Sequence, residues 1–406
     1  MARGRILFLL LILVCIFSIS GCWDKRELNE ITLTSALAVE TTPEGQYRVI
    51  VQNINPQGSN PESSKGTSLG SEKSYTNIIA EGDSIYEALN KLSRLTPSKL
   101  FFAHTNLIIV SEDLARDRGV RDILDYFERS YQFRKDLWFV IGKGNPLDLM
   151  EASSKLSYIP SQMIFEIIKS NKNSTFFVAL QLGQFIRLLQ DESTQPYTAG
   201  VEIQSNISDK AGDEANEENS QPQFEIVLKS TAIFHQDKLV GWLDQKESSG
   251  FQWIRGEHKS GMISFADPED PEKQIGTRVL NNKTKLKPQI ENGQITLKIE
   301  IEFESYLAEA QGDADLFEPS VITDLEIAQE EQVNEEVRAV LQKAQKKYKA
   351  DIFGFGEKVH HSDPELWDEL KAVWSEVFPG VAVDIQVKSK IRHTTEIVKR
   401  AEPPEK

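Results

Sequence analysis

The sequence predicts an α+β fold of more than one domain, with mixed or antiparallel sheets packed against helices. Three observations support this class. Runs of apolar and β-branched residues with period 2 occur beside runs with helical spacing. These runs do not alternate as a regular βαβ series, and no internal repeat is visible. About 385 residues remain after a 21-residue leader, too many for one hydrophobic core, so two or three domains are expected.

The first half of the chain predicts strands and amphipathic helices on either side of a long polar loop at 56–74. Ser84 and Glu87 form a capping-box pattern at the start of a helix. The predicted strands are 32–39, 47–54, 75–80, 105–111 and 135–142. The apolar faces of two helices are Ile85, Leu89 and Leu92, and Val120, Ile123, Leu124 and Phe127. Residues 145–191 are expected to be helical in pieces, interrupted at Pro160 and near Asn171.

A polar, acidic stretch at 205–222 is the predicted boundary between the two halves. It holds five acidic residues, one lysine and no aromatic residue, so it cannot bury enough apolar surface to fold alone. The predicted organisation is a leader at 1–21, an N-terminal α/β domain at 22–204, this linker or loop, and a C-terminal α+β domain at 223–395.

The second half predicts more strand than the first. Asn292-Gly293 is a two-residue hairpin signal that joins strands 276–290 and 295–305. One long helix is expected from Ser320 to about Lys349, and another begins at Pro364 with Asp363 as its N-cap. The remaining predicted strands are 224–234, 239–242 and 381–391.

The amino-terminal segment has the layout of a secretory signal. Arg3 and Arg5 precede an apolar run from Ile6 to Ile19, and small residues lead to Gly21-Cys22. This pattern is typical of a bacterial lipoprotein, which is cleaved between Gly21 and Cys22 and carries a diacylglyceryl group on the Cys22 thiol. The alternative is an uncleaved anchor, but the run is shorter than the ~20 apolar residues that a spanning helix needs. After Cys22 no segment approaches that length without charges.

The charge of the chain is strongly acidic. The formal net charge is −16, and loss of the leader with Arg3 and Arg5 leaves −18. This balance argues against nucleic acid as a partner and against electrostatic adhesion to an anionic membrane, because both require clustered Lys and Arg. Membrane contact is therefore expected through the acyl chains on Cys22. Loss of Cys15 with the leader leaves one cysteine, so no disulfide is expected.

No motif in a suitable context predicts catalysis, a cofactor or a metal site. Ser68 lies in a GxSxG match, but inside the polar loop rather than at a strand-to-helix turn. Gly354-Phe355-Gly356 is expected to form a tight turn. His360 and His361 are expected in an exposed loop rather than at a metal. One predicted helical face is expected to be either a core stripe or a docking surface for another protein. It is formed by Trp367, Leu370, Trp374 and Val377.

Four segments together resemble one family, the Ger(x)C lipoproteins, which are the C subunits of spore germinant receptors. The first is GCWDKRELNEI at 21–31, directly at the lipidation site. The others are 101–134, with a strand, a histidine and a helix; 230–256, with a Gly-x-x-Trp stretch; and 347–391, beginning KYKADIFGFGEKVHH. One departure is the end of the last strand, Arg392-His393-Thr394-Thr395, where the family commonly has a basic residue and a glycine turn.

The resemblance implies a function that composition does not. Members are held by the lipidated cysteine on the outer face of the spore inner membrane and work with an A and a B membrane subunit. Together these subunits detect nutrient germinants and trigger germination, and the C subunit has no established enzymatic activity. The family fold has three domains, so one half is expected to divide again within about 150–270. The other reading of the sequence is an extracytoplasmic lipoprotein that binds a small nutrient and delivers it to a transporter-like partner.

The residues just after the anchor are expected to lie close to the bilayer and to these partners. They would then orient the protein or contact the membrane subunits; alternatively, they form the first packed segment of the N-terminal domain. These residues are Trp23, Asp24, Arg26, Glu27, Leu28 and Asn29.

Overall fold

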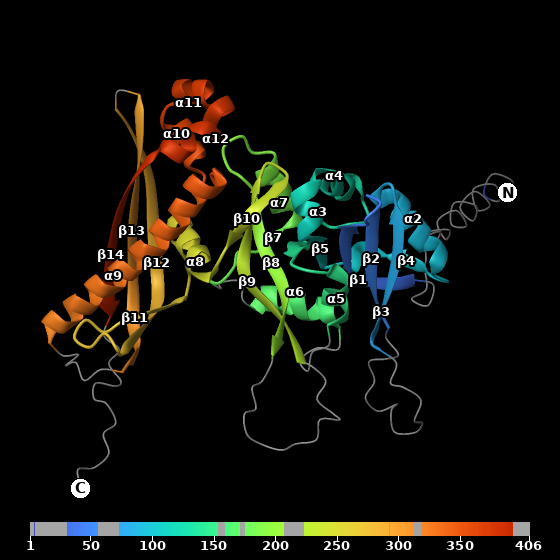
Figure 1. The fold of residues 1–406 in the computed structure, drawn as a ribbon, viewed down its shortest axis with the longest axis horizontal. Coiled ribbons are helices and arrows are strands. Elements are labelled where there is room, and N and C mark those ends of the chain that lie inside the picture. The colour runs from blue at the N-terminus through green and yellow to red at the C-terminus, as the bar shows by residue number, and fades with distance from the viewer. Residues whose placement is uncertain are drawn as a thin grey trace, which may run out of the picture.

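The computed structural model describes residues 31–55, 73–152, 159–170, 175–206, 223–291, 293–311 and 318–392, together with Gly4. The predicted loop, apart from residues 73 and 74, lies outside these ranges, and so does the acidic stretch apart from 205 and 206. Two sheets follow one another along the long axis of the molecule, with helices α8 and α9 beside the second (Figure 1). The expected α+β class is confirmed, and both sheets are mixed.

The large sheet has the order β10-β9-β8-β6-β5-β1-β2-β3, with β4 beside β1 and β7 beside β6. The strands β1, β5, β6 and β8 run parallel to one another, and antiparallel strands lie on both sides of them. The strands of this sheet are β1 (Ile31–Thr41), β2 (Tyr47–Ile54), β3 (Tyr75–Gly82), β4 (Lys99–Phe101), β5 (Leu107–Ser111), β6 (Trp138–Gly142), β7 (Leu180–Gln181), β8 (Tyr197–Asn206), β9 (Gln223–His235) and β10 (Lys238–Leu243).

Apolar side chains from alternate strand positions bury both faces of the large sheet. Leu37 and Val39 pack with the helices of one face, and Ala36 and Ala38 belong to a second core with α5 and α6. The helices are α2 (Ile85–Leu95), α3 (Glu112–Asp117), α4 (Arg121–Arg129), α5 (Pro146–Glu151), α6 (Pro160–Ser170) and α7 (Leu182–Leu189). A new helical piece begins at Pro160, which takes the first helical position of α6.

The C-terminal part is a four-stranded sheet of order β11-β12-β13-β14. The β12–β13 hairpin is confirmed, with Ile290 opposite Ile295 and Gly293 at φ 77° in the turn. The elements are α8 (Gln245–Arg255), β11 (Met262–Ala266), β12 (Gln274–Glu291), β13 (Gln294–Ala310), α9 (Pro319–Gln342), a π-helix (Lys343–Tyr348), α10 (Phe355–Ser362), α11 (Pro364–Leu370), α12 (Trp374–Val377) and β14 (Ala382–Arg392).

The large sheet continues across the stretch predicted as a domain boundary. Asn206 and Gln223 are paired neighbours in β8 and β9, so 207–222 connects two strands of one sheet. The elements change from the large sheet to the C-terminal sheet later, between Leu243 of β10 and Met262 of β11.

Three local predictions need correction. His360 and His361 lie in the last turn of α10 rather than in a loop. The predicted long helix is α-helical only to Gln342, and a π-helix follows it from Lys343 to Tyr348. The Glu87 carboxylate accepts from the Asp83 amide instead of closing a capping box on Ser84, whose hydroxyl still accepts from the Glu87 amide. Within the described ranges no helix has both the length and the apolar character needed to cross a membrane.

Candidate functional site

The residues that the sequence places at the membrane lie outside the described part of the chain. They are Gly21, Cys22, Trp23, Asp24, Arg26, Glu27, Leu28 and Asn29. The chain enters the described fold at Ile31, which pairs with Lys99 of β4. The features with unusual geometry lie instead where the large sheet meets the C-terminal part, and in the block that follows α9.

The first of these features is the close approach of α8 and α9 at Gly250. A Cβ on Gly250 would lie 2.1 Å from the Glu336 carbonyl oxygen, so only glycine allows the two helix backbones to approach this closely. Phe251, Trp253 and Ile254 of α8 are fully or almost fully buried. They belong to an apolar cluster that contains Leu37 of β1 as well as Ile299 of β13, so one core is continuous through both sheets.

The side chain of Glu336 connects α9 to α8 at the same point. Its carboxylate accepts hydrogen bonds from the Ser249 hydroxyl at 2.6 Å and from the Trp253 indole at 3.2 Å. Burial raises the pKa of Glu336, and these donors oppose that rise. Two ion pairs add to this connection. Lys246 of α8 pairs with Glu335 of α9, and Lys343, directly after α9, pairs with Glu247 of α8.

Trp253 also holds a buried histidine. Its ring stacks on His258, with centroids 3.8 Å apart and planes at 9°. The side chain of His258 is buried, and its Nδ1 has no hydrogen-bond partner among the described residues. Burial lowers the pKa of His258 to about 3, so this imidazole is neutral at ordinary pH.

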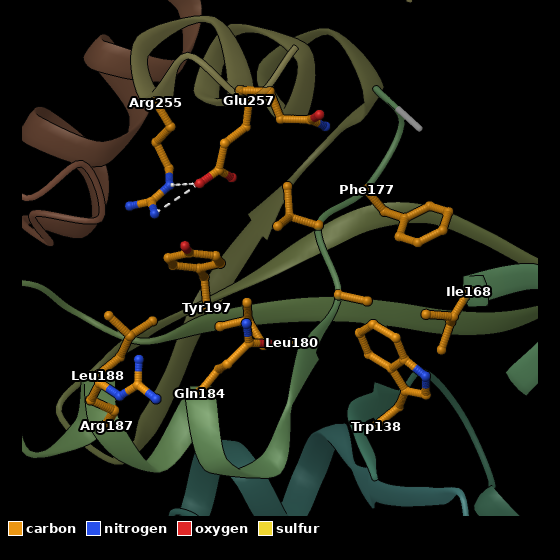
Figure 2. Close-up of a pocket in the computed structure, with 13 residues that line it drawn as sticks. Trp138, Ile168, Phe177, Leu180, Gln184, Arg187, Leu188, Tyr197, Arg255 and Glu257 are labelled. Atoms are coloured by element: carbon orange, nitrogen blue, oxygen red, sulfur yellow. Dashed lines mark hydrogen bonds and ion pairs between the residues drawn. The ribbon is translucent and has the colours of Figure 1, made fainter. Parts of the chain in front are cut away.

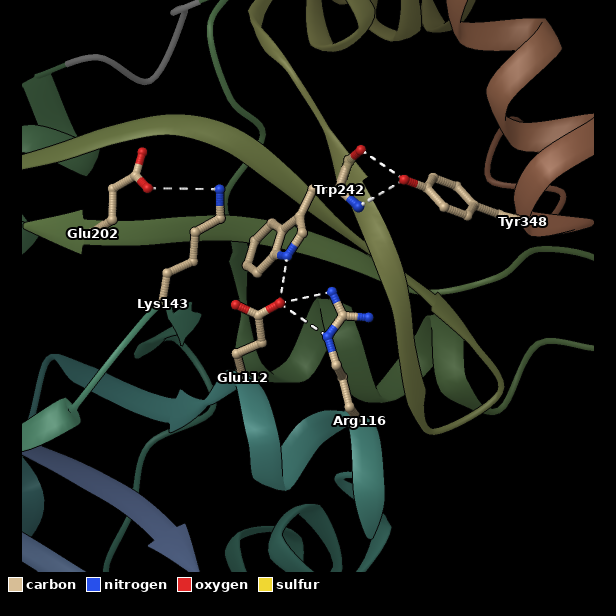
Figure 3. A network of polar contacts seen from close by, with 6 residues as sticks. All are labelled: Glu112, Arg116, Lys143, Glu202, Trp242 and Tyr348. Atoms are coloured by element: carbon tan, nitrogen blue, oxygen red, sulfur yellow. Dashed lines mark hydrogen bonds and ion pairs between the residues drawn. The ribbon is translucent and has the colours of Figure 1, made fainter.

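A second connection between the sheets runs through Tyr348 and Trp242 (Figure 3). The Tyr348 hydroxyl accepts from the Trp242 backbone N–H at 3.0 Å and donates to the Trp242 carbonyl at 2.9 Å. The ring lies directly over Gly241, where a Cβ would be 2.3 Å from it. Tyr348 of the π-helix therefore pairs with both the backbone N–H and the backbone C=O of Trp242 in the edge strand β10.

The Trp242 indole continues this connection towards α3. Its N–H donates to Glu112 at 2.9 Å, and Arg116 also binds that carboxylate, at 2.7 and 2.9 Å. The ammonium of Lys143 lies 4.3 Å from the centre of the indole ring. Contacts from the C-terminal π-helix thus reach a helix of the N-terminal half through one tryptophan.

Asp351 organises the block that follows α9. Its buried carboxylate accepts from the amides of residues 353, 354, 355 and 356 and from the Trp374 indole, at 2.8–3.2 Å. It therefore caps the start of α10 and fixes Trp374, which packs on Trp367. Burial raises the pKa of Asp351 to about 6, against the effect of these donors. Both tryptophans are buried, so this face is a core stripe.

A pocket of about 370 Å³ lies between α8 and the 177–188 segment of the large sheet (Figure 2). Trp138, Phe177 and Leu188 contribute apolar walls. Arg255 is paired with Glu257 at 3.0 Å, and Arg187 forms no ion pair within the described part of the chain. Burial raises the pKa of Tyr197 at the pocket wall to about 12. Apolar walls with a few convergent charged groups suit a small polar ligand.

The candidate chemical groups of the sequence are not brought together. Ser68 lies outside the described ranges. His361 contacts the Glu357 carbonyl at 2.8 Å, and His360 stacks on Trp367. No group of three or more His, Cys, Asp or Glu in the described residues is placed to hold a metal.

Two family models match the chain, one on each side of residues 204–228. Residues 24–203 match the model described as "Spore germination protein N-terminal domain", and residues 229–395 match "Spore germination B3/GerAC like, C-terminal". The chain belongs to the GerAC family of spore germination proteins. The family resemblance expected from the sequence is therefore confirmed.

Relatives cover almost the whole length of this GerAC family member. Spore germination protein KC of Bacillus subtilis strain 168 is 28% identical over 405 residues and covers 96% of each chain. Spore germination protein B3 of the same strain is 24% identical over 395 residues, 96% of this chain and 97% of the relative. The crystal structure of the GerBC protein, 24% identical, covers 88% of this chain and 97% of its own with a TM-score of 0.57, which shows the fold.

Sequence reasoning found the segments of this site but missed the residues that connect them. In the sequence, Gly250 and Trp253 stand out only as a Gly-x-x-Trp stretch, and Tyr348 only falls near the end of the predicted long helix. Asp351 was not singled out. Its signal is an acidic residue in the otherwise apolar and glycine-rich run ADIFGFG, where an unpaired charge would be costly to bury.

Proposed function

We propose that the chain is the lipid-anchored C subunit of a spore germinant receptor. It assembles with membrane A and B subunits, detects nutrient germinants with them and triggers spore germination. Its place is the outer face of the spore inner membrane, with Cys22 carrying the diacylglyceryl group. The observation that carries this proposal is similarity to spore germination proteins over almost the whole chain, from a match that begins two residues after Cys22.

The proposed role is mechanical and binding rather than enzymatic. The contacts of Trp242, Tyr348, Trp253 and Glu336 hold the two sheets in a fixed relation. A subunit built in this way transmits a displacement at one end to the other, because packed interfaces resist continuous deformation. This supports a scaffold or relay within a receptor.

Deletion of the gene tests the proposal. Spores lacking the chain should fail to germinate with at least one nutrient, while vegetative growth stays normal. A strain that also lacks any paralogue removes compensation. Normal germination of that strain with every nutrient tested would contradict the proposal.

The residues after Cys22 are proposed to contact the membrane subunits. Replacing Arg26 or Glu27 by Ala should then reduce nutrient germination without reducing the amount of the protein in spores. Loss of the protein itself would instead indicate that this segment is packed into the N-terminal domain. Quantitative immunoblots beside germination assays separate the two results.

A second candidate function rests on the pocket beside α8. The chain would capture a small nutrient there and deliver it to a transporter-like partner. Arg187 and the Arg255–Glu257 pair supply charges of both signs beside apolar walls. Calorimetry with the leaderless chain and the germinants of its organism tests this. Micromolar binding that Arg187→Ala weakens supports capture, and no binding at millimolar ligand excludes it.

A further inference from the structure

The C-terminal sheet has one covered face and one open face. Leu297, Ile299 and Ile301 of β13 are fully buried on the side where α8 and α9 pack. Side chains alternate along a strand, so the residues between them point the other way. We call this opposite side of β12, β13 and β14 the outer face, and its side chains are exposed or half-buried.

Two strands of the outer face carry cations at every second position. In β12 these are Lys283, Lys285 and Lys287, whose partners in β13 are residues 302, 300 and 298. In β14 they are Lys388 and Lys390, opposite residues 302 and 304. The pairing register therefore brings two separate lysine runs onto one surface, on either side of a shared central strand.

Three more cations extend this surface, for a total of eight. Lys298 lies in the central strand, Arg278 is opposite Tyr306, and Arg392 is opposite the same tyrosine on the other side. Both arginines are exposed.

Six carboxylates share the outer face, so eight cations leave a surplus of two positive charges. Glu300 binds Lys287 at 2.8 Å and Lys298 at 3.2 Å, and these two lysines lower the pKa of Glu300 to about 2. The other five are Glu302, Glu304 and Asp384, together with Glu291 opposite Gln294 and Glu309 opposite Gly276 near the strand ends. The whole chain has a net charge of −16, so the positive surplus of this face is set against a strongly negative remainder.

Three lysines of the outer face have no ion-pair partner among the described residues. These are Lys283, Lys388 and Lys390, which surround Glu302 and Glu304. Their charge is therefore available to something outside the chain.

We propose that the outer face of the C-terminal sheet docks on an anionic phospholipid membrane. The face is broad and rich in lysine. Each cation held near an anionic bilayer surface strengthens binding to the bilayer about five-fold. Protein interfaces have the opposite composition, because their cores are depleted in Lys and Glu and enriched in aromatic residues. The acidic remainder of the chain is repelled by the same surface, so this face is the one turned towards it.

This contact rests on the proposed function only for bringing the chain to a membrane. If the negative charge were spread evenly over the surface, lipid alone would be expected to hold the protein at the membrane. The outer face adds a second, electrostatic contact at the end of the molecule far from β1 (Figure 1). Two membrane contacts would restrain the orientation of the body, which a single flexible tether does not.

A vesicle assay tests the proposal without the lipid anchor. Residues 22–406 with Cys22→Ala keep every described residue from 31 to 392, so the folded part is complete. Flotation would be measured with phosphatidylglycerol:phosphatidylcholine vesicles and with phosphatidylcholine alone, at 50 and 300 mM NaCl. Binding only to the anionic vesicles, weakened by salt, is expected. No binding to anionic vesicles at 50 mM NaCl, or equal binding to neutral ones, overturns the proposal.

A pair of matched variants locates the contact. K283E/K388E/K390E reverses the three unpaired lysines, and should weaken binding at least ~100-fold. The control R94E/K99E/K169E makes the same change in net charge at exposed cations of the N-terminal half, which form no ion pair with any described residue. It should change binding less than about 5-fold. Equal losses in both variants overturn the proposal. Unchanged vesicle binding of the first variant, with loss of capture by a purified receptor subunit, also overturns it and assigns the face to a protein. Because the assay uses no spores, its outcome is independent of germination.

Discussion

Replacing Gly250 by Ala should destabilise the protein, although helix propensity alone predicts the reverse. An Ala in a helix interior is favoured over Gly by about 1 kcal/mol. Here the new Cβ would lie 2.1 Å from the carbonyl oxygen and 2.5 Å from the carbonyl carbon of Glu336. Both atoms belong to the α9 backbone, so relief requires the two helices to separate by roughly 1 Å, since unstrained C···O contacts begin well above 3 Å.

The size of the effect follows from what that separation breaks. Overpacking of a core costs about 1–3 kcal/mol. The hydrogen bonds from Ser249 and Trp253 to the Glu336 carboxylate lie across the gap, and hydrogen bonds to charged groups contribute about 1.5–3 kcal/mol each. If one of them is lost, and the gain in propensity is subtracted, the net destabilisation is about 3 kcal/mol.

Urea unfolding of the leaderless chain, followed by tryptophan fluorescence, measures this change. Gly380→Ala is the matched control, because a Cβ there has no atom within 4 Å and the backbone does not require glycine. We expect the control to unfold within about 1 kcal/mol of the wild type. A Gly250→Ala variant as stable as the wild type, or more stable, would refute the close approach of α8 and α9.

Two further predictions concern buried titratable groups. The pKa of His258 is about 3 in the folded protein against 6.5 when exposed, so the unfolded state takes up a proton first as pH falls. Stability should therefore be lost below pH 6.5, by about 1.4 kcal/mol between pH 7.5 and 5.5. His258→Phe keeps a ring on Trp253 and should remove that part of the pH dependence; identical pH profiles in urea unfolding would refute this. Asp351→Asn places amide donors among five N–H donors and should destabilise by about 3 kcal/mol or more at pH 7.5, whereas Asp384→Asn on the exposed strand should not. Equal thermal midpoints for these two variants would argue against the role of Asp351 as a cap.

Elements determined by local pattern could be predicted from the sequence. The hairpin around Asn292-Gly293 and the helix that starts at Pro364 follow from neighbouring residues, because turn chemistry and capping act over a few positions. The buried strand at 105–111 is equally local, since its continuous apolar run needs no knowledge of its partners. Family membership could also be predicted, because it depends on the residues of four segments and not on contacts between them.

Contacts between distant segments could not be predicted in this way. The pairing of β8 with β9 joins residues on both sides of a polar stretch, and nothing in that stretch indicates which strands it connects. Glu336 looks like one more acid on a solvated helix until α8 is packed on it. The net charge of the sequence does not indicate the cationic outer face of the C-terminal sheet. That face depends on the strand register, which places Lys283 and Lys388 beside the same strand.

We propose that lipid on Cys22 holds the protein at the membrane where germination is triggered. The most direct test replaces Cys22 by Ala in the organism that encodes the chain, and measures nutrient germination together with the protein in spore membranes washed with 0.5 M NaCl. The salt wash removes electrostatic binding through the outer face. We predict that the variant protein leaves the washed membranes and that germination with its nutrients is lost. Wild-type germination with the protein still in the washed membranes would contradict the claim.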